Sequence, residues 1–447
     1  MNGLAALNPT ELLLVAALVA LMAAEVAQGL RTRSWTGLYR PTLFVAAILL
    51  YYVVIGPIRA LGIPDGTVYR ALEHRGLLIW GWAGALISYA SLLCGFYAAY
   101  PRRPPRRLIL SAEPERLHRL GLRLCQVGLV MFTLVTGSRV LALINPFAAR
   151  ELTDGGFGEQ LADVGALANY FNYAVNLLIP GLCLMMAAWL RQRRHGLALL
   201  LWLLAAGGIY VSLGFRYRLV LLVIPLILLL FMARRRRPSL RWLALFLAGF
   251  ILLNGIIGLT RSYGRGLDLE RIEGLQTGEL FDAGFGEVAV FFTTAGVIEQ
   301  AATDVPYFVG FEPLVNTLFF PIPRTLFPGK PKGEYNFIHH FLLYGRKHYR
   351  GAAFLNYAEY YIMFGWWSVV ALSALLGHLL RRLWTWFLWR QDEPLAQVIY
   401  LLTASYLYVV ISRGYLAQVV MLFSFTVLPL FLLYRHYARR LPAAPGW

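Results

Sequence analysis

The sequence predicts an all-α polytopic membrane protein with about eleven transmembrane helices and one long extracytoplasmic loop. Hydrophobic residues make up 59% of the 447 residues and charged residues only 14%, whereas a soluble domain carries about 25% charged residues. A helix needs about 20 mostly apolar residues to cross a bilayer. Segments of this kind lie at roughly 11–30, 41–61, 76–100, 120–145, 166–190, 197–214, 218–233, 242–260, 353–380, 395–412 and 416–434.

Basic residues mark every second connection between these segments. Five connections and the C-terminal segment hold more than half of the 41 Lys and Arg residues: 31–40, 102–119, 191–195, 234–241, 381–390 and 434–440. By the positive-inside rule these connections face the cytoplasm. The uncharged N-terminus then lies outside and the C-terminus inside, as an odd number of spans requires. We expect no cleavable signal peptide, because no basic segment precedes the first apolar run.

Three regions follow from this topology. Residues 1–260 form a bundle of eight spans, 261–352 form the long extracytoplasmic loop with part of the active site, and 353–447 hold the last three spans. A long ordered loop in a compact protein is usually functional. The basic runs are too short and scattered for nucleic acid, so we expect them to set topology and contact anionic membrane lipid. No internal repeat or inverted pair of broken helices is visible, which disfavours many transporters.

Arginines on the extracytoplasmic side break the positive-inside pattern. Such residues often snorkel to lipid phosphates, but here several span ends carry them, and arginine at a membrane boundary is costly without a compensating anion. The planar guanidinium suits phosphate oxygens. The pattern predicts a cationic cavity for a phosphorylated or diphosphorylated group, formed by Arg139, Arg216, Arg218, Arg261, Arg324, Lys330 and Arg413.

One carboxylate is expected at membrane depth. Glu359 follows Asn356 in the apolar segment "GAAFLNYAEYYIMFGWW", and an ionisable residue in a span is a functional candidate. A buried ion pair with one of the arginines is the structural alternative. His339 and His340 precede this segment and are a second candidate for the general base. The structural alternative is that they are ordinary polar residues of the loop. No zinc, nucleotide or aspartate-rich motif occurs, and Cys94, Cys125 and Cys183 lack metal-ligand spacing, so we expect neither cofactor nor metal.

Three stretches resemble one family. "FFPIPRTLFPGKP" (319–331), "NYAEYYIMFG" (356–365) and the turn "GFRYRLV" (214–220) are similar to segments of bacterial O-antigen or oligosaccharide repeat-unit polymerases (Wzy-type). The proline motif is the most specific of the three. Phe327 and Gly329 replace a tryptophan and an acidic residue of that motif. The likeness covers roughly the C-terminal half of the chain, since the first five spans match only in being hydrophobic.

The resemblance implies a GT-C-like, inverting, metal-independent glycosyltransferase at the outer face of the bacterial cytoplasmic (inner) membrane. It would move a growing glycan from undecaprenyl diphosphate onto a new undecaprenyl-diphosphate-linked oligosaccharide, as in O-antigen, lipopolysaccharide or related polysaccharide biosynthesis of the cell envelope. Expected partners are these lipid-linked oligosaccharides, membrane lipid, a chain-length regulator and a flippase. Glu359, His339 or His340 would serve as base, and the arginines would bind the diphosphate.

Other classes stay open at this point. A lipid-linked glycan ligase would share the long loop and the arginines. A flippase or transporter of lipid-linked oligosaccharides would need alternating access and would be expected to show pseudosymmetry. A non-catalytic scaffold would need neither Glu359 nor converging arginines. The proline motif favours the polymerase.

Overall fold

Helices and their turns form every regular element in the part of the chain that the structure describes. The computed structural model describes residues 3–32, 34–62, 75–98, 113–137, 139–147, 168–260, 278, 284, 287, 289–303, 308–322, 326–329 and 353–439. The chain divides into two compact units. Unit 1 comprises Met1–Arg102, Gly286–Thr385 and Leu407–Met421, and unit 2 comprises Arg103–Phe285, Trp386–Tyr406 and Leu422–Trp447.

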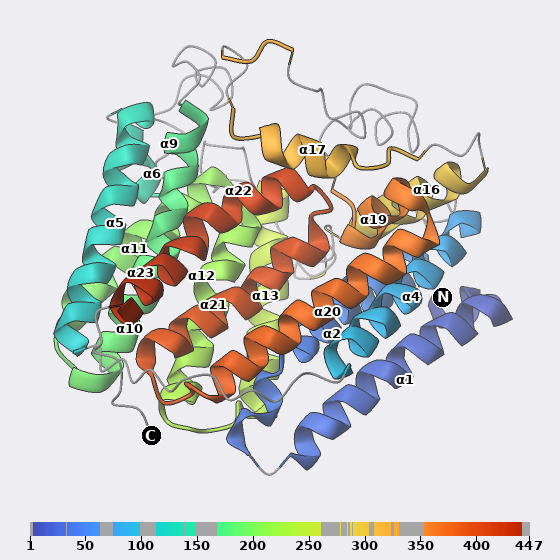
Figure 1. The fold of residues 1–447 in the computed structure, drawn as a ribbon, viewed down its shortest axis with the longest axis horizontal. Helices are drawn as coiled ribbons and strands as arrows, with labels where there is room; N and C mark the ends of the chain where they lie inside the picture. The colour runs from blue at the N-terminus through green and yellow to red at the C-terminus, as the bar shows by residue number, and fades with distance from the viewer. Residues whose placement is uncertain are drawn as a thin grey trace. The chain divides into compact units, whose positions relative to one another are not determined.

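Unit 1 is built around two buried helices, α16 (Ala289–Thr303) and α19 (Asn356–Phe364), which pack against each other and against α4 (Leu78–Tyr97). Small residues allow the close contact, and Tyr357 donates a hydrogen bond to the carbonyl of Gly81 (3.0 Å). The other elements are α1 (Pro9–Arg31), α2 (Pro41–Leu49), the π-helical turn η3 (Leu50–Ile55), α3 (Gly56–Gly62), α17 (Glu312–Phe319) and most of α20 (Trp366–Leu388) (Figure 1).

Unit 2 contains a tight pair of helices, α5 (Pro114–Thr136) and α10 (Leu178–Gln192). Glycines set their separation, because a Cβ at Gly121 would lie 2.5 Å from the carbonyl oxygen of Gly181. Around this pair lie α6 (Arg139–Ile144), α9 (Ala168–Ala174), α11 (Gly196–Leu213), α12 (Arg216–Ala233), α13 (Leu240–Thr260) and α23 (Leu428–Arg439). The helices α20, α21 (Pro394–Ser412) and α22 (Leu416–Thr426) contribute residues to both units.

The helices show that the chain is a multi-pass membrane protein. Within the described residues, eight helices are long and apolar enough to cross a bilayer, or nine if the bent pair α22–α23 forms one span. The eight are Pro9–Arg31, Pro41–Gly62, Leu78–Tyr97, Pro114–Thr136, Tyr170–Gln192, Gly196–Leu213, Arg216–Ala233 and Pro394–Ser412. The all-α prediction is confirmed. The count of eleven stays a prediction, since α13 and α20 cover two further predicted spans as helices but are not among the eight.

Three predicted segments contain a break, a helix or a bend that the sequence did not predict. The predicted span 353–380 is interrupted at Gly365, whose φ of +69° separates α19 from α20. The region 261–352, predicted as one long loop, contains the buried helix α16 and the short helix α17. Helix α16 has 15 residues, whereas a helix needs about 20 to cross a bilayer. A prediction based on apolar runs of that length therefore assigns this segment to the loop. The backbone also bends by 45° between α22 and α23.

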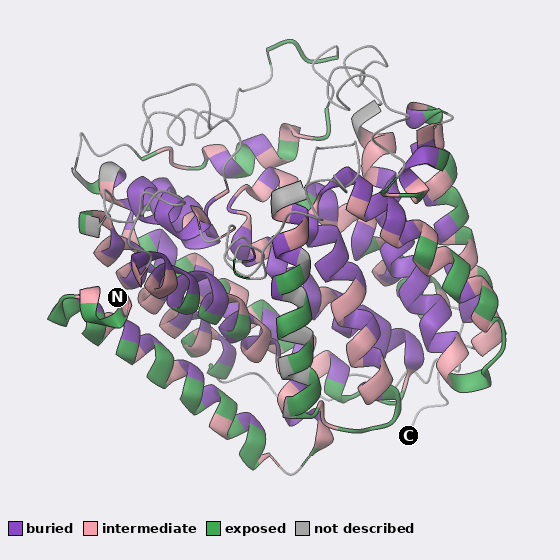
Figure 2. Ribbon diagram, turned by 180° about the vertical axis from the view of Figure 1, so that it is seen from behind, coloured by how far each residue is buried: buried purple, intermediate pink, exposed green. Residues whose placement is uncertain are grey.

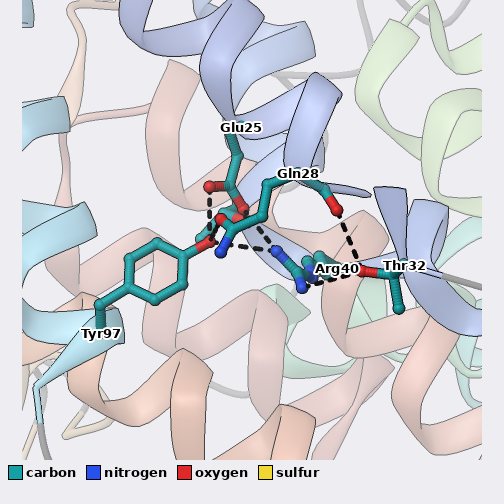
Figure 3. Close-up of polar contacts among 6 residues, drawn as sticks. Glu25, Gln28, Thr32, Arg40 and Tyr97 are labelled. Atoms are coloured by element: carbon teal, nitrogen blue, oxygen red, sulfur yellow. Dashed lines mark hydrogen bonds and ion pairs between the residues drawn. The ribbon is translucent and has the colours of Figure 1, made fainter. Parts of the chain in front are cut away.

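A buried carboxylate ties α1 to the rest of unit 1. Glu25 accepts hydrogen bonds from the hydroxyls of Thr42 (2.5 Å) and Tyr97 (2.6 Å), and Arg40 lies 3.7 Å from it. Arg40 also reaches Thr32 and Tyr97, so the cluster links α1, the start of α2 and the end of α4 (Figure 3). A buried charge must be paired and hydrogen-bonded, and these contacts meet that need. The face of α1 that points away from this cluster is exposed (Figure 2, beside the N label).

Two adjacent glycines of α11 allow a matched test of helix packing. A Cβ at Gly208 would lie 1.8 Å from the carbonyl oxygen of Ile144 in α6, whereas a Cβ at Gly207 would meet nothing within 4 Å. We expect Gly208→Ala to destabilise the protein by about 1–3 kcal/mol through overpacking. Gly207→Ala should be neutral or stabilising by about 0.5–1 kcal/mol, because alanine suits a helix better than glycine. Thermal unfolding of both purified variants in one detergent measures the difference, and equal midpoints would contradict the packing described.

Candidate functional site

The turn between α21 and α22, residues 413–415 of "SRGYL", is the centre of the candidate site. The amide of Gly414 donates to the carbonyl of Phe354 (2.6 Å), and Tyr415 donates to the carbonyl of Arg413 (2.7 Å). A Cβ at Gly414 would lie 2.6 Å from the Phe354 ring. Only glycine allows this approach, so the turn is fixed against the segment that leads into α19.

Arg413 extends from this turn to Glu287. The Nη2 atom of Arg413 lies 3.5 Å from Glu287 Oε1, and the side chains are 29% and 12% exposed. The hydroxyls of Tyr52 and Tyr408 donate to the second oxygen, Glu287 Oε2, at 2.6 and 2.9 Å. The two phenol oxygens also lie 2.8 Å apart. These three donors match an ionised carboxylate that is largely shielded from solvent.

Glu359 holds the other end of the same turn. Its Oε1 atom accepts a hydrogen bond from the backbone amide of Leu416 (2.9 Å), the first residue of α22. The first amides of a helix have no partner within the helix, and a carboxylate at a helix N-terminus is favourable. Glu359 is only 3% exposed. The structure thus gives this side chain a positioning contact with a backbone amide, and both its chemical role and the ion pair with an arginine stay predictions.

Sequence reasoning brought Arg413 and Glu359 into one site, and the structure places both at one turn. It missed Glu287, Tyr52 and Tyr408. The signal for Glu287 was an acid directly before the apolar run 289–303, which length alone had assigned to the loop. The tyrosines gave no signal, because aromatic residues are frequent throughout the apolar segments.

Unit 2 contains a buried cation at the start of α12. Arg218 is only 2% exposed. Its Nε donates to Asn176 Oδ1 (3.1 Å), and its guanidinium lies 4.7 Å from the centre of the Phe215 ring. Its Nη1 has no hydrogen-bond partner among the described residues. Burial of a charge is costly unless it is paired, so an anion at this helix N-terminus would relieve the cost.

The remaining predicted cations lie beside this one or outside the description. Arg216, also buried, begins α12, and the half-buried Arg139 begins α6 in the same unit. Arg413 belongs to unit 1. Arg261, Arg324, Lys330, His339 and His340 lie outside the described residues. Convergence of all these groups on one cavity therefore stays a prediction.

Neither a metal site in the described residues nor a similar protein points to a function for this chain. Within the described ranges, no group of three or more His, Cys, Asp or Glu residues is arranged to hold a metal ion. Comparison of the chain with protein-family models, with curated proteins and with solved structures finds no match.

The contact of Glu359 with Leu416 can be tested by a pair of substitutions. Glu359→Gln keeps an oxygen that accepts the Leu416 amide, whereas Glu359→Ala leaves that amide without this acceptor. A lost partner for a shielded amide costs about 1–3 kcal/mol. We expect the midpoint of thermal unfolding to fall clearly for Glu359→Ala and much less for Glu359→Gln. If the glutamine variant is as unstable as the alanine variant, the carboxylate charge rather than the hydrogen bond holds the turn.

Proposed function

We propose that the protein is a membrane glycosyltransferase that polymerises undecaprenyl-diphosphate-linked oligosaccharide repeat units into O-antigen or a related polysaccharide. The observation that carries the proposal is the turn 413–415, which holds a cation against Glu287 and lies next to Glu359. The reaction needs a base for the acceptor hydroxyl and cations for the diphosphate that leaves. The resemblance of the proline motif supports the same reaction.

In this reaction Glu287 acts as the base. It removes the proton of the acceptor hydroxyl, whose oxygen then bonds to the anomeric carbon of the donor glycan. The bond between that carbon and the diphosphate oxygen breaks, and its electron pair stays on undecaprenyl diphosphate. We assign this role to Glu287 rather than Glu359, because the side chain of Glu287 is 12% exposed whereas Glu359 is only 3% exposed. His339 and His340 remain alternative bases.

Arginines stabilise the departing diphosphate in the proposed mechanism. In unit 1, Arg413 lies beside the base. In unit 2, the buried Arg218 at the start of α12 has an Nη1 atom with no hydrogen-bond partner in the described part of the chain. Arg139, Arg216, Arg261, Arg324 and Lys330 complete the proposed set. The basic connections would face the cytoplasm, so this chemistry takes place at the outer face of the inner membrane, with lipid-linked oligosaccharides, a chain-length regulator and a flippase as partners.

A flippase of lipid-linked oligosaccharides is the second candidate. Interrupted helices are common at the substrate sites of transporters, and the described residues include a π-helical turn at Leu50–Ile55, a break at Gly365 and the bend between α22 and α23. A ligase that transfers finished glycan to another lipid differs from the polymerase only in its acceptor, so the product distinguishes the two.

Polymerisation by purified protein in nanodiscs is the decisive measurement. With native lipid-linked repeat units and neither nucleotide nor metal, we expect wild type to produce a ladder of longer glycans. Glu287→Gln should lower the rate by about 10²–10⁴-fold, the usual contribution of a general base, and Arg324→Ala should abolish the ladder. Glu359→Gln should retain activity, as should the control Glu115→Gln, which removes a half-exposed carboxylate of unit 2.

Each other outcome has a distinct meaning. Loss of activity in Glu359→Gln but not in Glu287→Gln would reverse the two assignments. No ladder from wild type would overturn the polymerase, and a lipid-translocation assay on the same nanodiscs would then test the flippase.

The proposed diphosphate site at Arg218 can be tested without catalysis. A ligand that binds only the folded state raises its stability in proportion to RT ln(1 + [L]/Kd). We expect inorganic pyrophosphate to raise the unfolding temperature of wild type and of the control Arg194→Gln, which removes an exposed arginine. Arg218→Gln, checked for folding by gel filtration, should lose this rise. An equal rise in all three proteins would place the anion elsewhere.

A further inference from the structure

Helix α17 (Glu312–Phe319) has its apolar side chains on the outside. Phe311, Leu314, Val315 and Leu318 are all exposed, with Phe311 at 65% and Leu318 at 75%. Their spacing of three, four and seven residues places them on one face of a helix. Ile322, Leu326 and Phe327 continue the exposed apolar set beyond the helix. We call these seven residues the α17 face.

The inward side of α17 is the more polar one. Asn316 and Pro313 are buried, and Asn316 lies 3.5 Å from the carboxylate of Glu312. A surface helix of a soluble protein has the opposite arrangement, with its apolar stripe toward the core. The pattern of α17 is therefore inverted, and it is the pattern of a helix whose outer face meets hydrocarbon.

Aromatic and backbone contacts anchor α17 at both ends. Phe311 packs edge-on against Phe364 (ring centres 4.9 Å apart), and Phe320 packs edge-on against Tyr415 of the candidate turn (6.1 Å). The amides of Val309 and Gly310 donate to the carbonyls of Ile362 and Met363, at the end of α19. The helix therefore extends from the break at Gly365 to the turn that holds Arg413.

The α17 face is continuous with the apolar surface of a long helix of unit 1. Phe364, which contacts Phe311, is exposed, and so are Trp367, Val370, Leu375 and Leu379 along α20. Spanning helices elsewhere in the chain have leucines of similar exposure, such as Leu13 in α1 and Leu204 in α11. A contiguous exposed apolar patch of this kind marks an interaction surface. Because the chain is a multi-pass membrane protein, and the exposed apolar residues of α20 continue this patch, the occupant that we argue for is bilayer lipid.

We propose that the α17 face is inserted in the membrane interface, with bilayer lipid as its partner. Interfacial helices bury one apolar face at the boundary between headgroups and acyl chains, and burial of one large apolar side chain contributes about 1.5–3 kcal/mol. α17 would thus fix the level of the turn 413–415 in the membrane, through the contact of Phe320 with Tyr415. This inference does not depend on the proposed reaction.

Collision measurements on spin labels test the insertion. In a background with Cys94, Cys125 and Cys183 replaced, single cysteines at Phe311, Leu314 or Leu318 receive a nitroxide, and the full chain is placed in nanodiscs of phosphatidylcholine and phosphatidylglycerol. Collisions with oxygen, which concentrates in hydrocarbon, are compared with collisions with a water-soluble nickel complex. Labels at Leu200 (exposed on the apolar helix α11) and Arg194 (exposed loop) serve as references.

We expect the α17 labels to match Leu200, with frequent oxygen collisions and a loss of nickel collisions relative to Arg194. Nickel collisions at the level of Arg194 would overturn the proposal, because the face would then lie in water. Protection from both reagents would also overturn it, in favour of a covering protein segment. Spin–spin broadening that requires two chains in one disc would indicate a second copy as the partner. Because three positions of the α17 face are labelled separately, the test still gives a result if one of the variants fails to fold.

Discussion

The approach of Gly414 to Phe354 is the contact on which the candidate site depends. The Gly414 amide and the Phe354 carbonyl join the turn 413–415 to the segment before α19. Because both ends of α19 are fixed, by this contact and by the break at Gly365, Glu359 meets the first amide of α22. Arg413 is directed to Glu287 from the same turn. Satisfied backbone groups at a helix interruption are a requirement in a membrane protein, and here they also position the charges.

Two buried charges of the described residues, Glu25 and Arg218, differ in how they are paired. Glu25 is surrounded by Thr42, Tyr97 and Arg40, so its cost of burial is met within the fold. Arg218 has one amide acceptor and an aromatic ring, and its Nη1 has no acceptor among the described residues. An uncompensated buried charge is strongly destabilising. Glu25 is therefore a structural carboxylate, whereas the contacts of Arg218 leave one of its guanidinium nitrogens without an acceptor among the described residues, which is why we propose an anion there.

Much of the fold could be predicted from composition and length, because a bilayer dictates both. The all-α class and most span positions follow from apolar runs of about 20 residues. The break at Gly365 could not be predicted, because it depends on a single backbone angle. The burial of α16 could not be predicted either, because it depends on contacts with α4 and α19. For the site, Arg413 and Glu359 stood out as charges in apolar surroundings. Glu287 did not, because it precedes a helix that length had assigned to a loop.

The short helix α16 follows directly after Glu287, which is hydrogen-bonded to a tyrosine of an apolar helix. Its 15 residues extend about 22 Å at 1.5 Å per residue, less than the hydrocarbon core of about 30 Å. Glu287 precedes this helix directly and is bonded to Tyr52, which lies near the middle of the span Pro41–Gly62. A carboxylate at that level needs donors, and Tyr52, Tyr408 and Arg413 supply them. Glu287, which the sequence assigns to a loop, is therefore a hydrogen-bonded acid within the bundle of unit 1.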